Sequence, residues 1–262
     1  MSTIIADITS RMSARLLAVA DMLGSNRYRC VADVGCDHGY VSICLVQRET
    51  TVRAIAMDVR EGPLSRAEEN IRQLGLSDRI EIRLSDGLQG LREGEADGLV
   101  IAGMGGKLIM SILEHSDATA LGIRTAVLQP QSDLFQFREY LGIKDYSILD
   151  ERVIFDDGKY YFPMLVSFDR EKRCDGPYKE AIRGIRKRIA DIVPENELDT
   201  TLTRLCRRYG AINIFRAGRM FGSYLEHERE VAVTVISEID KKRHPARYTE
   251  LEKEIKDIEL LI

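Results

Sequence analysis

The stretch that decides the fold reads DVGCDHGY and runs from Asp33 to Tyr40. The apolar residues 30–34 predict a short buried strand, and residues 40–47 are apolar enough to predict a packed helix. A strand that turns into a helix through glycines is typical of a doubly wound sheet, in which ligands bind at the carboxyl end of the central strand. The two glycines let a ligand approach the backbone closely, and the helix N-terminus offers free N–H groups. We therefore predict a ligand-binding turn here.

Strand and helix patterns alternate along the first two thirds of the chain. Strands are predicted at residues 30–34, 53–59, 79–84, 98–102 and 125–129, and helices at 15–23, 40–47, 62–74, 107–114 and 134–141. Two later β-rich runs, 146–154 and 160–168, are separated by Asp156-Asp157-Gly158, which is a hairpin signal. Five alternations predict an α/β fold, with a parallel sheet covered by helices on both faces.

The character of the chain changes after Asp169. Charged helices are predicted at residues 178–192, 226–239 and 248–261. We therefore expect two domains, an α/β domain over residues 1–169 and an α-helical, coiled-coil-like C-terminal domain over residues 170–262. The net charge is −4, yet residues 170–219 carry 13 Lys/Arg against 7 Asp/Glu. This basic stretch indicates either a contact surface for a polyanion or a solvated helical face.

The bulk composition is that of a globular protein. Hydrophobic residues make up 44% and charged residues 31% of the 262 residues, which allows a sizeable core. No apolar run approaches the ~20 residues that span a bilayer, and residues 1–12 lack the apolar segment of a secretory signal. The cysteines form no C-x-x-C pair and the four histidines have no metal-ligand spacing. We expect a cytoplasmic protein with no membrane contact, no metal and reduced thiols. The cysteines are Cys30, Cys36, Cys44, Cys174 and Cys206.

Acidic residues stand at the ends of the second and third predicted strands. Asp58 comes nineteen residues after Gly39, where a carboxylate can accept both ribose hydroxyl protons of a nucleoside. Ser85-Asp86-Gly87 follows the third strand, and Asp86 can accept a hydrogen bond from the exocyclic amine of adenine, because an ionised carboxylate only accepts. The alternative is that these are ordinary strand-end turns, in which Asp and Gly are common.

The glycine pattern argues against a nicotinamide cofactor. The dinucleotide fingerprint G-x-G-x-x-G would need glycines where Asp37 and Tyr40 stand. The methyltransferase pattern begins instead with an acid on the first strand, here Asp33, and continues G-x-G-x-G. The chain departs from that pattern once, at Asp37.

Two more segments at strand ends have suitable chemistry for a flat base. The three glycines in GMGG, residues 103–106, would open space beside the methyl donor, or would simply form a flexible loop. Gln129 and Gln131 flank Pro130 and can read a base edge from a rigid backbone, although the proline is equally able to begin a helix.

The motifs DVGCDHGY, EGP (residues 61–63), SDGL (85–88), IAGMGG (101–106) and LQPQ (128–131) resemble those of the bacterial tRNA (adenine-22-N1)-methyltransferase family. The resemblance covers residues 15–168 and resumes at residues 221–225. It implies a Rossmann-like class I methyltransferase sheet that ends in a terminal antiparallel hairpin, S-adenosylmethionine as cofactor, and tRNA as partner. Two departures are Gln131, where the family usually has asparagine, and residues 170–219, which resemble an insertion or a strongly diverged stretch. The family's helical tail is thought to hold tRNA.

The resemblance also assigns roles residue by residue. It implies an S-adenosylmethionine site formed by Asp33, Gly35, Asp37, His38, Gly39, Asp58, Val59, Asp86, Gly87, Gly103 and Met104. It implies target-base contacts from Tyr40, Gly105, Gly106, Gln129, Pro130 and Gln131. Asp37 is the candidate catalytic residue, because it replaces a glycine at the reactive end of the cofactor. Its carboxylate would stabilise charge on the methylated base or take a proton from N6; contact with the cofactor's amino group is the alternative. Tyr40 or Phe135 would supply a stacking face.

Other functions stay open at this point. A class I methyltransferase acting on rRNA, a protein or a small molecule keeps the same cofactor, and an inactive cofactor-binding or RNA-binding scaffold keeps the same fold. Basic side chains beside the cleft would favour a polyanion; the candidates are Arg183, Arg186, Lys187, Arg207 and Arg208. We expect a monomer.

Overall fold

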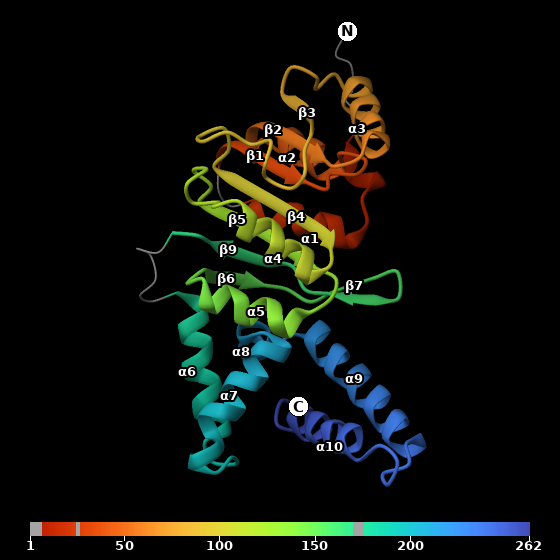
Figure 1. The fold of residues 1–262 in the computed structure, drawn as a ribbon, viewed down its shortest axis with the longest axis vertical. Coiled ribbons are helices and arrows are strands. Elements are labelled where there is room, and N and C mark those ends of the chain that lie inside the picture. Colours follow the sequence, from red (N-terminus) through yellow and green to blue (C-terminus); the bar gives the residue numbers. More distant parts are fainter. Residues whose placement is uncertain (1–6, 25–26, 170–175) are drawn as a thin grey trace. The chain divides into compact units, whose positions relative to one another are not determined.

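The computed structural model describes residues 7–24, 27–169 and 176–262 (Figure 1). Its chain forms two compact units, Met1–Pro177 and Tyr178–Ile262. Cys174 and the first six residues of the C-terminal domain expected from the sequence, 170–175, lie outside the described residues.

A seven-stranded sheet forms the centre of the first unit. Its order is β3-β2-β1-β4-β5-β9-β6. The first five strands in that order are parallel, and β9 is antiparallel to both of its neighbours. The strands are β1 (Tyr28–Val34), β2 (Thr51–Asp58), β3 (Ile80–Leu84), β4 (Gly98–Met104), β5 (Thr125–Pro130), β6 (Ser147–Glu151) and β9 (Met164–Ser167). The α/β class I methyltransferase sheet expected from the sequence is confirmed.

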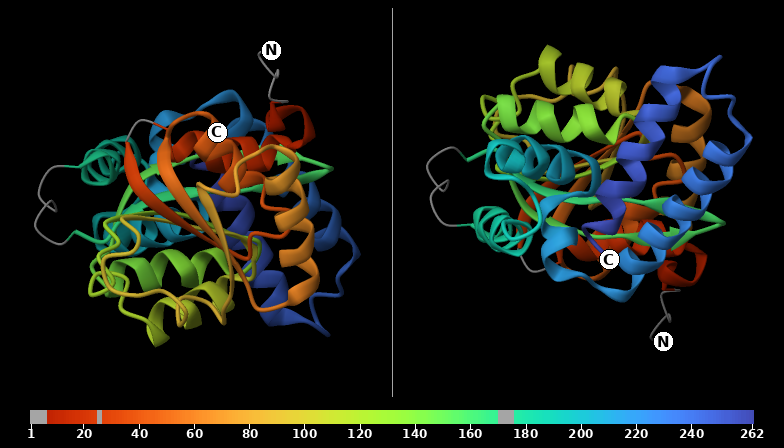
Figure 2. Two further views of the ribbon diagram at one scale, coloured as in Figure 1. Left: turned by 90° about the horizontal axis from the view of Figure 1, so that it is seen from above. Right: turned by 90° about the horizontal axis from the view of Figure 1, so that it is seen from below.

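Helices cover both faces of this sheet. A 3-10 turn, η1 (Ile8–Arg11), leads into α1 (Ala14–Leu23), which packs against α2 (Tyr40–Gln47). The helices α4 (Gly106–His115) and α5 (Leu134–Ile143) pack against each other on the opposite face (Figures 1 and 2). The remaining helix, α3 (Glu61–Gln73), contacts β2 and β3. The helices α1 to α5 and the strands β1 to β5 each match a prediction to within a few residues.

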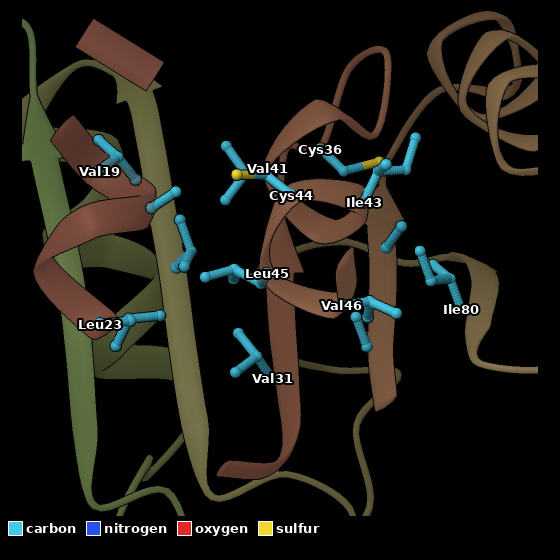
Figure 3. Packing of buried hydrophobic residues seen from close by; sticks show 14 of the residues in the cluster. Val19, Leu23, Val31, Cys36, Val41, Ile43, Cys44, Leu45, Val46 and Ile80 are labelled. Carbon is cyan, nitrogen blue, oxygen red and sulfur yellow. The ribbon is translucent and has the colours of Figure 1, made fainter. Parts of the chain in front are cut away.

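The core explains why α2 has no polar face. Figure 3 shows Leu45 of α2 beside Val31 of β1, with Ile43 of α2 to one side and Val19 and Leu23 of α1 to the other. All five side chains are fully buried. Because α2 is buried between the sheet and α1, its position is fixed, and so is the turn that leads into it.

The terminal hairpin differs from the prediction in detail. Each of its two β-rich runs divides, so that β7 (Ile154–Asp156) and β8 (Lys159–Tyr161) form a separate two-stranded sheet. Asp157 and Gly158 connect them with φ of 46° and 75°, the left-handed values that a tight hairpin turn needs. The antiparallel strand β9 lies between β5 and β6 rather than at the edge, so β6 is the edge strand.

The second unit is helical. It contains α6 (Pro177–Ile189), α7 (Glu195–Tyr209), α8 (Ala211–Arg216), α9 (Arg219–Glu238) and α10 (Pro245–Glu259). The helices α9 and α10 pack against each other. Two basic side chains of α7 are used inside the unit: Arg204 binds the Asp257 carboxylate through two contacts of 2.6 and 2.7 Å, and Arg208 pairs with Glu254. The sequence prediction included neither α7 nor α8.

Over residues 7–24, 27–169 and 176–262, no helix is long and apolar enough to span a membrane. The same residues include no cluster of three or more His, Cys, Asp or Glu side chains suited to a metal ion.

Candidate functional site

The turn between β1 and α2 has a backbone that few residues adopt. Gly35 and Gly39 have φ of 75° and 72°, and Asp37 has φ of 42°. The N–H groups of Gly35 and Cys36 both donate to the Met57 carbonyl of β2, at 2.8 and 3.0 Å. The left-handed angles fold the chain back on itself, and the two hydrogen bonds fix the resulting loop to the neighbouring strand.

Asp33 connects the end of β1 to the start of α2. One of its carboxylate oxygens accepts hydrogen bonds from the Ser42 backbone N–H at 3.2 Å and the Ser42 hydroxyl at 2.7 Å. Burial raises the pKa of Asp33 to about 6; the Ser42 hydrogen bonds oppose this rise and the nearby charge of Asp58 adds to it. The carboxyl group also lines the cavity described next, so a buried acid faces whatever binds there.

A cavity of about 710 Å³ opens at the carboxyl ends of β1 to β4. It is lined by the predicted cofactor residues Asp33, Gly35, Asp37, His38, Asp58, Val59, Asp86, Gly87, Gly103 and Met104. Gly39 is the predicted cofactor residue that does not line it: a Cβ there would lie 3.1 Å from the Ala67 Cβ, so this glycine allows α3 to approach the turn. The cavity volume suits a nucleoside-sized ligand.

Two carboxylates lie at the β2 and β3 side of the cavity. Asp58 is buried, and one of its oxygens accepts a hydrogen bond of 2.9 Å from the Arg60 backbone N–H. The Ser85 N–H donates to the Asp58 carbonyl at 2.9 Å, which ties the segment that carries Asp86 to the end of β2. A buried carboxylate held in this way is a rigid acceptor for hydroxyl groups.

The opposite side of the cavity, at β4 and β5, is built around a buried amide. Gln129 is fully buried, and its side-chain oxygen accepts from Arg15 Nη1 at 2.8 Å and from the Gly103 N–H at 3.1 Å. Its amide nitrogen donates to the Pro130 carbonyl at 3.1 Å. Both ends of the Gln129 amide are therefore used inside the protein. It orients Arg15 and Gly103, which do line the cavity.

The predicted base-contacting residues divide between the cavity wall and its support. Tyr40 and Gln131 line the cavity, whereas Gly105, Gly106, Gln129 and Pro130 do not. At Gly106 a Cβ would lie 2.5 Å from the Ser132 carbonyl oxygen, so this glycine is needed for close packing at the start of α4. Phe135, on α5, is not among the lining residues.

Asp37 lies at the exposed rim of the cavity. Its carboxylate is 3.6 Å from Arg66 Nη2 and 3.8 Å from His38 Nε2. The His38 ring is stacked on the ring of Tyr40, with 5.2 Å between centroids and 17° between planes. The structure therefore brings the side chains of Asp37, His38 and Tyr40 together at this rim.

Several lining residues were absent from the prediction. Arg15 comes from the first turn of α1. Arg60 directly precedes α3, and Arg66 lies in the second turn of that helix. Leu108 and Ile112 come from α4. Their positions depend on how helices pack beside the strand ends. The motif EGP, which opens α3, was a signal for the two arginines, since a helix that starts after a strand end begins beside the ligand.

Comparisons with known proteins agree with this geometry. The methyltransferase domain family matches residues 12–164. A tRNA (adenine(22)-N(1))-methyltransferase of Bacillus subtilis is 35% identical over 167 residues, which is 63% of this chain and 69% of that protein.

Among solved structures, a putative tRNA (m1A22) methyltransferase of Streptococcus pneumoniae in complex with S-adenosyl-L-methionine aligns with a TM-score of 0.73 and 26% identity, over 96% of this chain and 100% of that one. The m1A22 tRNA methyltransferase of B. subtilis aligns with a TM-score of 0.72 and 25% identity, over 96% and 99%. Coverage this complete extends over the helical unit, beyond the residues that the methyltransferase domain family matches. The chain belongs to the tRNA (adenine-22-N1)-methyltransferase family.

Proposed function

We propose that this chain transfers a methyl group from S-adenosylmethionine to N1 of adenine 22 in tRNA. The observation that carries the proposal is the cavity at the strand ends, with carboxylates at β1, β2 and β3 and an open glycine wall at β4. The tRNA (adenine(22)-N(1))-methyltransferase of B. subtilis, 35% identical over 63% of this chain, supports the same activity.

The residues present fit S-adenosylmethionine. A Cβ on Gly35 would lie 2.3 Å from the Met104 Cε, so the glycine lets the Met104 side chain pack directly against the turn, and both residues line the cavity. Asp58 is the acceptor for the ribose hydroxyls and Asp86 for the adenine amine. The cofactor carries a sulfonium cation, and the carboxylates of Asp33 and Asp37 give the wall a matching negative charge. As cofactor contacts we propose the ten predicted residues that line the cavity.

The protein's main task in this reaction is positioning. Bound S-adenosylmethionine supplies an electrophilic methyl group, and adenine N1 has a lone pair that attacks it. Holding N1 in line with the S–CH3 bond, with water excluded, lowers the barrier by about 7–11 kcal/mol in favourable cases. Gly103 and the Arg15 guanidinium, both held by Gln129, shape the side of the cavity from which the base enters.

Asp37 is the proposed catalytic residue. Methylation at N1 leaves a positively charged adenine, and a carboxylate at the rim stabilises that charge or accepts a proton from N6. Arg66 and His38 keep the Asp37 side chain at the cavity. Tyr40, stacked on His38, offers the face on which the base rests. Because N1 lies on the Watson–Crick edge, adenine 22 must be unpaired or flipped out, at a cost of about a few kcal/mol.

RNA binding is proposed for the helical unit, with the catalytic domain ending near residue 169. Arg183 and Lys187 are exposed on α6 and are available to phosphates. Two other predicted contacts are used internally, since Arg186 pairs with Asp199 and Arg208 with Glu254. Phosphate contacts make binding weaken as salt rises. We propose a cytoplasmic monomer.

The test is to incubate the purified chain with labelled S-adenosylmethionine and unmodified tRNA, digest the RNA, and detect 1-methyladenosine at position 22 by mass spectrometry. An Asp37→Asn variant should still bind cofactor, with lower affinity, and should lose most of its turnover when it is assayed at saturating cofactor. Unchanged turnover would remove Asp37 from the mechanism. Cofactor binding without methylation of any tRNA would leave the fold and overturn the substrate.

A further inference from the structure

The Arg15 side chain is held at the cavity by neutral partners. Its Nη1 donates to the Gln129 side-chain oxygen at 2.8 Å, and its guanidinium lies over the Tyr161 ring, 5.3 Å from the ring centroid. The Asp156 carboxylate accepts from the Arg15 backbone N–H, at 3.2 Å, and not from the guanidinium. In the part of the chain that the structure describes, this guanidinium forms no ion pair. Arg15 is therefore a half-buried cation with a fixed orientation, and no carboxylate in contact with it neutralises its charge.

Arg15 lies at the β4 and β5 side of the cavity, away from the cofactor acids. The carboxylates proposed for the cofactor stand at the ends of β1, β2 and β3. From β1 the sheet continues through β4 to β5, the strand whose Gln129 binds the guanidinium. A Cβ on Gly103 of β4 would lie 3.5 Å from Arg15 Nη1, so the guanidinium borders the glycine wall. The arginine thus faces the part of the cavity that is left for the target nucleotide.

A fixed cation at this position opposes the reaction unless an anion arrives with the substrate. Methyl transfer moves a positive charge from the sulfonium to the adenine, and so brings that charge toward Arg15. Like charges repel more strongly in a cavity than in bulk water, because less solvent screens them. The neutral partners Gln129 and Tyr161 do not offset this repulsion. A phosphate does, and every internal nucleotide of an RNA has one on each side.

We propose that Arg15 binds a backbone phosphate next to the target adenosine, and that Gln129 is the residue that positions it. This inference rests on the proposed function. A guanidinium is planar and can donate to two oxygens of one phosphate at once. Among the described residues, Nη1 is the guanidinium nitrogen with a hydrogen-bond partner, so Nε and Nη2 are available to the phosphate. The bound phosphate neutralises Arg15 before positive charge reaches the adenine.

The experiment removes the charge from the arginine and from the phosphate, separately and together. A tRNA is assembled with one methylphosphonate linkage, which is uncharged, either 5′ or 3′ of adenine 22 and beside a 2′-deoxy sugar. The reference tRNA has the same deoxy sugar and a natural phosphate. Each tRNA is assayed with the wild type, with Arg15→Gln and with Arg11→Gln. Arg11 is the matched control, because it is exposed, lies at the end of η1 and does not line the cavity.

A phosphate contact predicts that at least one of the two linkages lowers kcat/KM of the wild type about 10- to 100-fold, the range for one charged hydrogen bond. Arg15→Gln should cause a similar loss with the reference tRNA. In that variant the methylphosphonate should cost little more, because both changes remove the same interaction. Arg11→Gln should stay as sensitive to the linkage as the wild type, and the Kd of Arg15→Gln for S-adenosylmethionine should not change.

Full wild-type activity on both methylphosphonate tRNAs would overturn the phosphate site, and this arm requires no substitution in the protein. An Arg15→Gln variant that is as sensitive to the linkage as the wild type would also overturn it. A raised Kd for S-adenosylmethionine in that variant, with the sensitivity to the linkage retained, would assign the arginine to the cofactor's carboxylate instead. The Kd of the wild type for each tRNA tests the proposed function separately. A wild type that binds the reference tRNA more tightly than the methylphosphonate tRNA, but methylates neither, would overturn that function and leave the phosphate site standing.

Discussion

Replacing Gly35 with alanine tests the cofactor site through two separate effects. Gly35 has φ of 75°, a backbone conformation that an L side chain resists, and the added Cβ would lie 2.3 Å from the Met104 Cε. The first effect, the backbone strain, lowers the stability of the fold and does not depend on the direction of the new methyl group. The second acts on the cavity, because both residues line it.

The size of each effect follows from the geometry. A left-handed alanine costs about 1–2 kcal/mol, which lowers the melting temperature of a unit of this size by about 2–8 °C. The Met104 side chain is flexible and must turn away from the new methyl group, at about 0.5–1.5 kcal/mol when it leaves a staggered rotamer. The space is then occupied by the methyl group or by the moved thioether. We expect the dissociation constant for S-adenosylmethionine to rise about tenfold, since about 1.4 kcal/mol corresponds to that factor.

A second substitution separates the two effects. Cofactor affinity by titration calorimetry and melting temperature would be measured for Gly35→Ala, Met104→Ala and the double variant. Removing the Met104 side chain relieves the 2.3 Å contact, so the double variant should bind cofactor as Met104→Ala does. It should still melt at the lower temperature of Gly35→Ala, because the backbone strain is unchanged. Wild-type affinity in Gly35→Ala, or a double variant no better than that single variant, would refute this account of the site.

Three further substitutions probe the remaining parts of the cavity. Asp58→Asn removes a buried charged acceptor and should weaken cofactor binding about 10- to 100-fold, since a charged hydrogen bond contributes about 1.5–3 kcal/mol. The KM for tRNA should change little. An equal loss of affinity for both ligands would argue against a ribose contact. Burial raises the pKa of Asp33 to about 6, because the buried charged form is disfavoured. Protonation of Asp33 as the pH falls through 6 should therefore stabilise the fold. It should also weaken binding of the cationic cofactor, because the negative charge is lost. In Asp33→Asn the affinity should be flat between pH 7 and pH 5, and a slope that persists there would assign it to another group. Arg15→Lys keeps the charge but loses the planar donor between Gln129 and Tyr161, so kcat should fall about tenfold with cofactor affinity retained, as single-turnover and binding measurements would show.

The main sheet was predictable because each of its strands carries its own signal. The run 40–47 has no polar face, and the structure buries it as α2 between the sheet and α1. Asp58 and Asp86 were predicted together because the carboxyl ends of neighbouring parallel strands meet at one edge. These are consequences of local pattern plus a general rule of parallel sheets.

The parts that were missed depend on contacts distant in sequence. Arg15 meets Gln129 across 114 residues, so nothing near either residue marks the pair. The division of the hairpin is different, because a signal was present: Pro163 separates β8 from β9, and proline does not continue a central strand. Helix α7 also had a signal in the sequence, because Leu198, Leu202 and Leu205 have helical spacing. They lie within the basic stretch 170–219, in which charge is the more prominent feature.

Asp37 shows why one departure from the glycine pattern leaves the fold intact. Its φ of 42° lies in the region that glycine adopts freely and that aspartate tolerates better than most other residues. The turn therefore keeps its glycine-like backbone and gains a carboxylate at the rim of the cavity, beside Arg66 and His38. Side-chain packing does not offset the energetic cost of this backbone conformation, since the Asp37 side chain is exposed. A strained and exposed charge at the mouth of a cavity is better explained by what enters the cavity than by the stability of the chain.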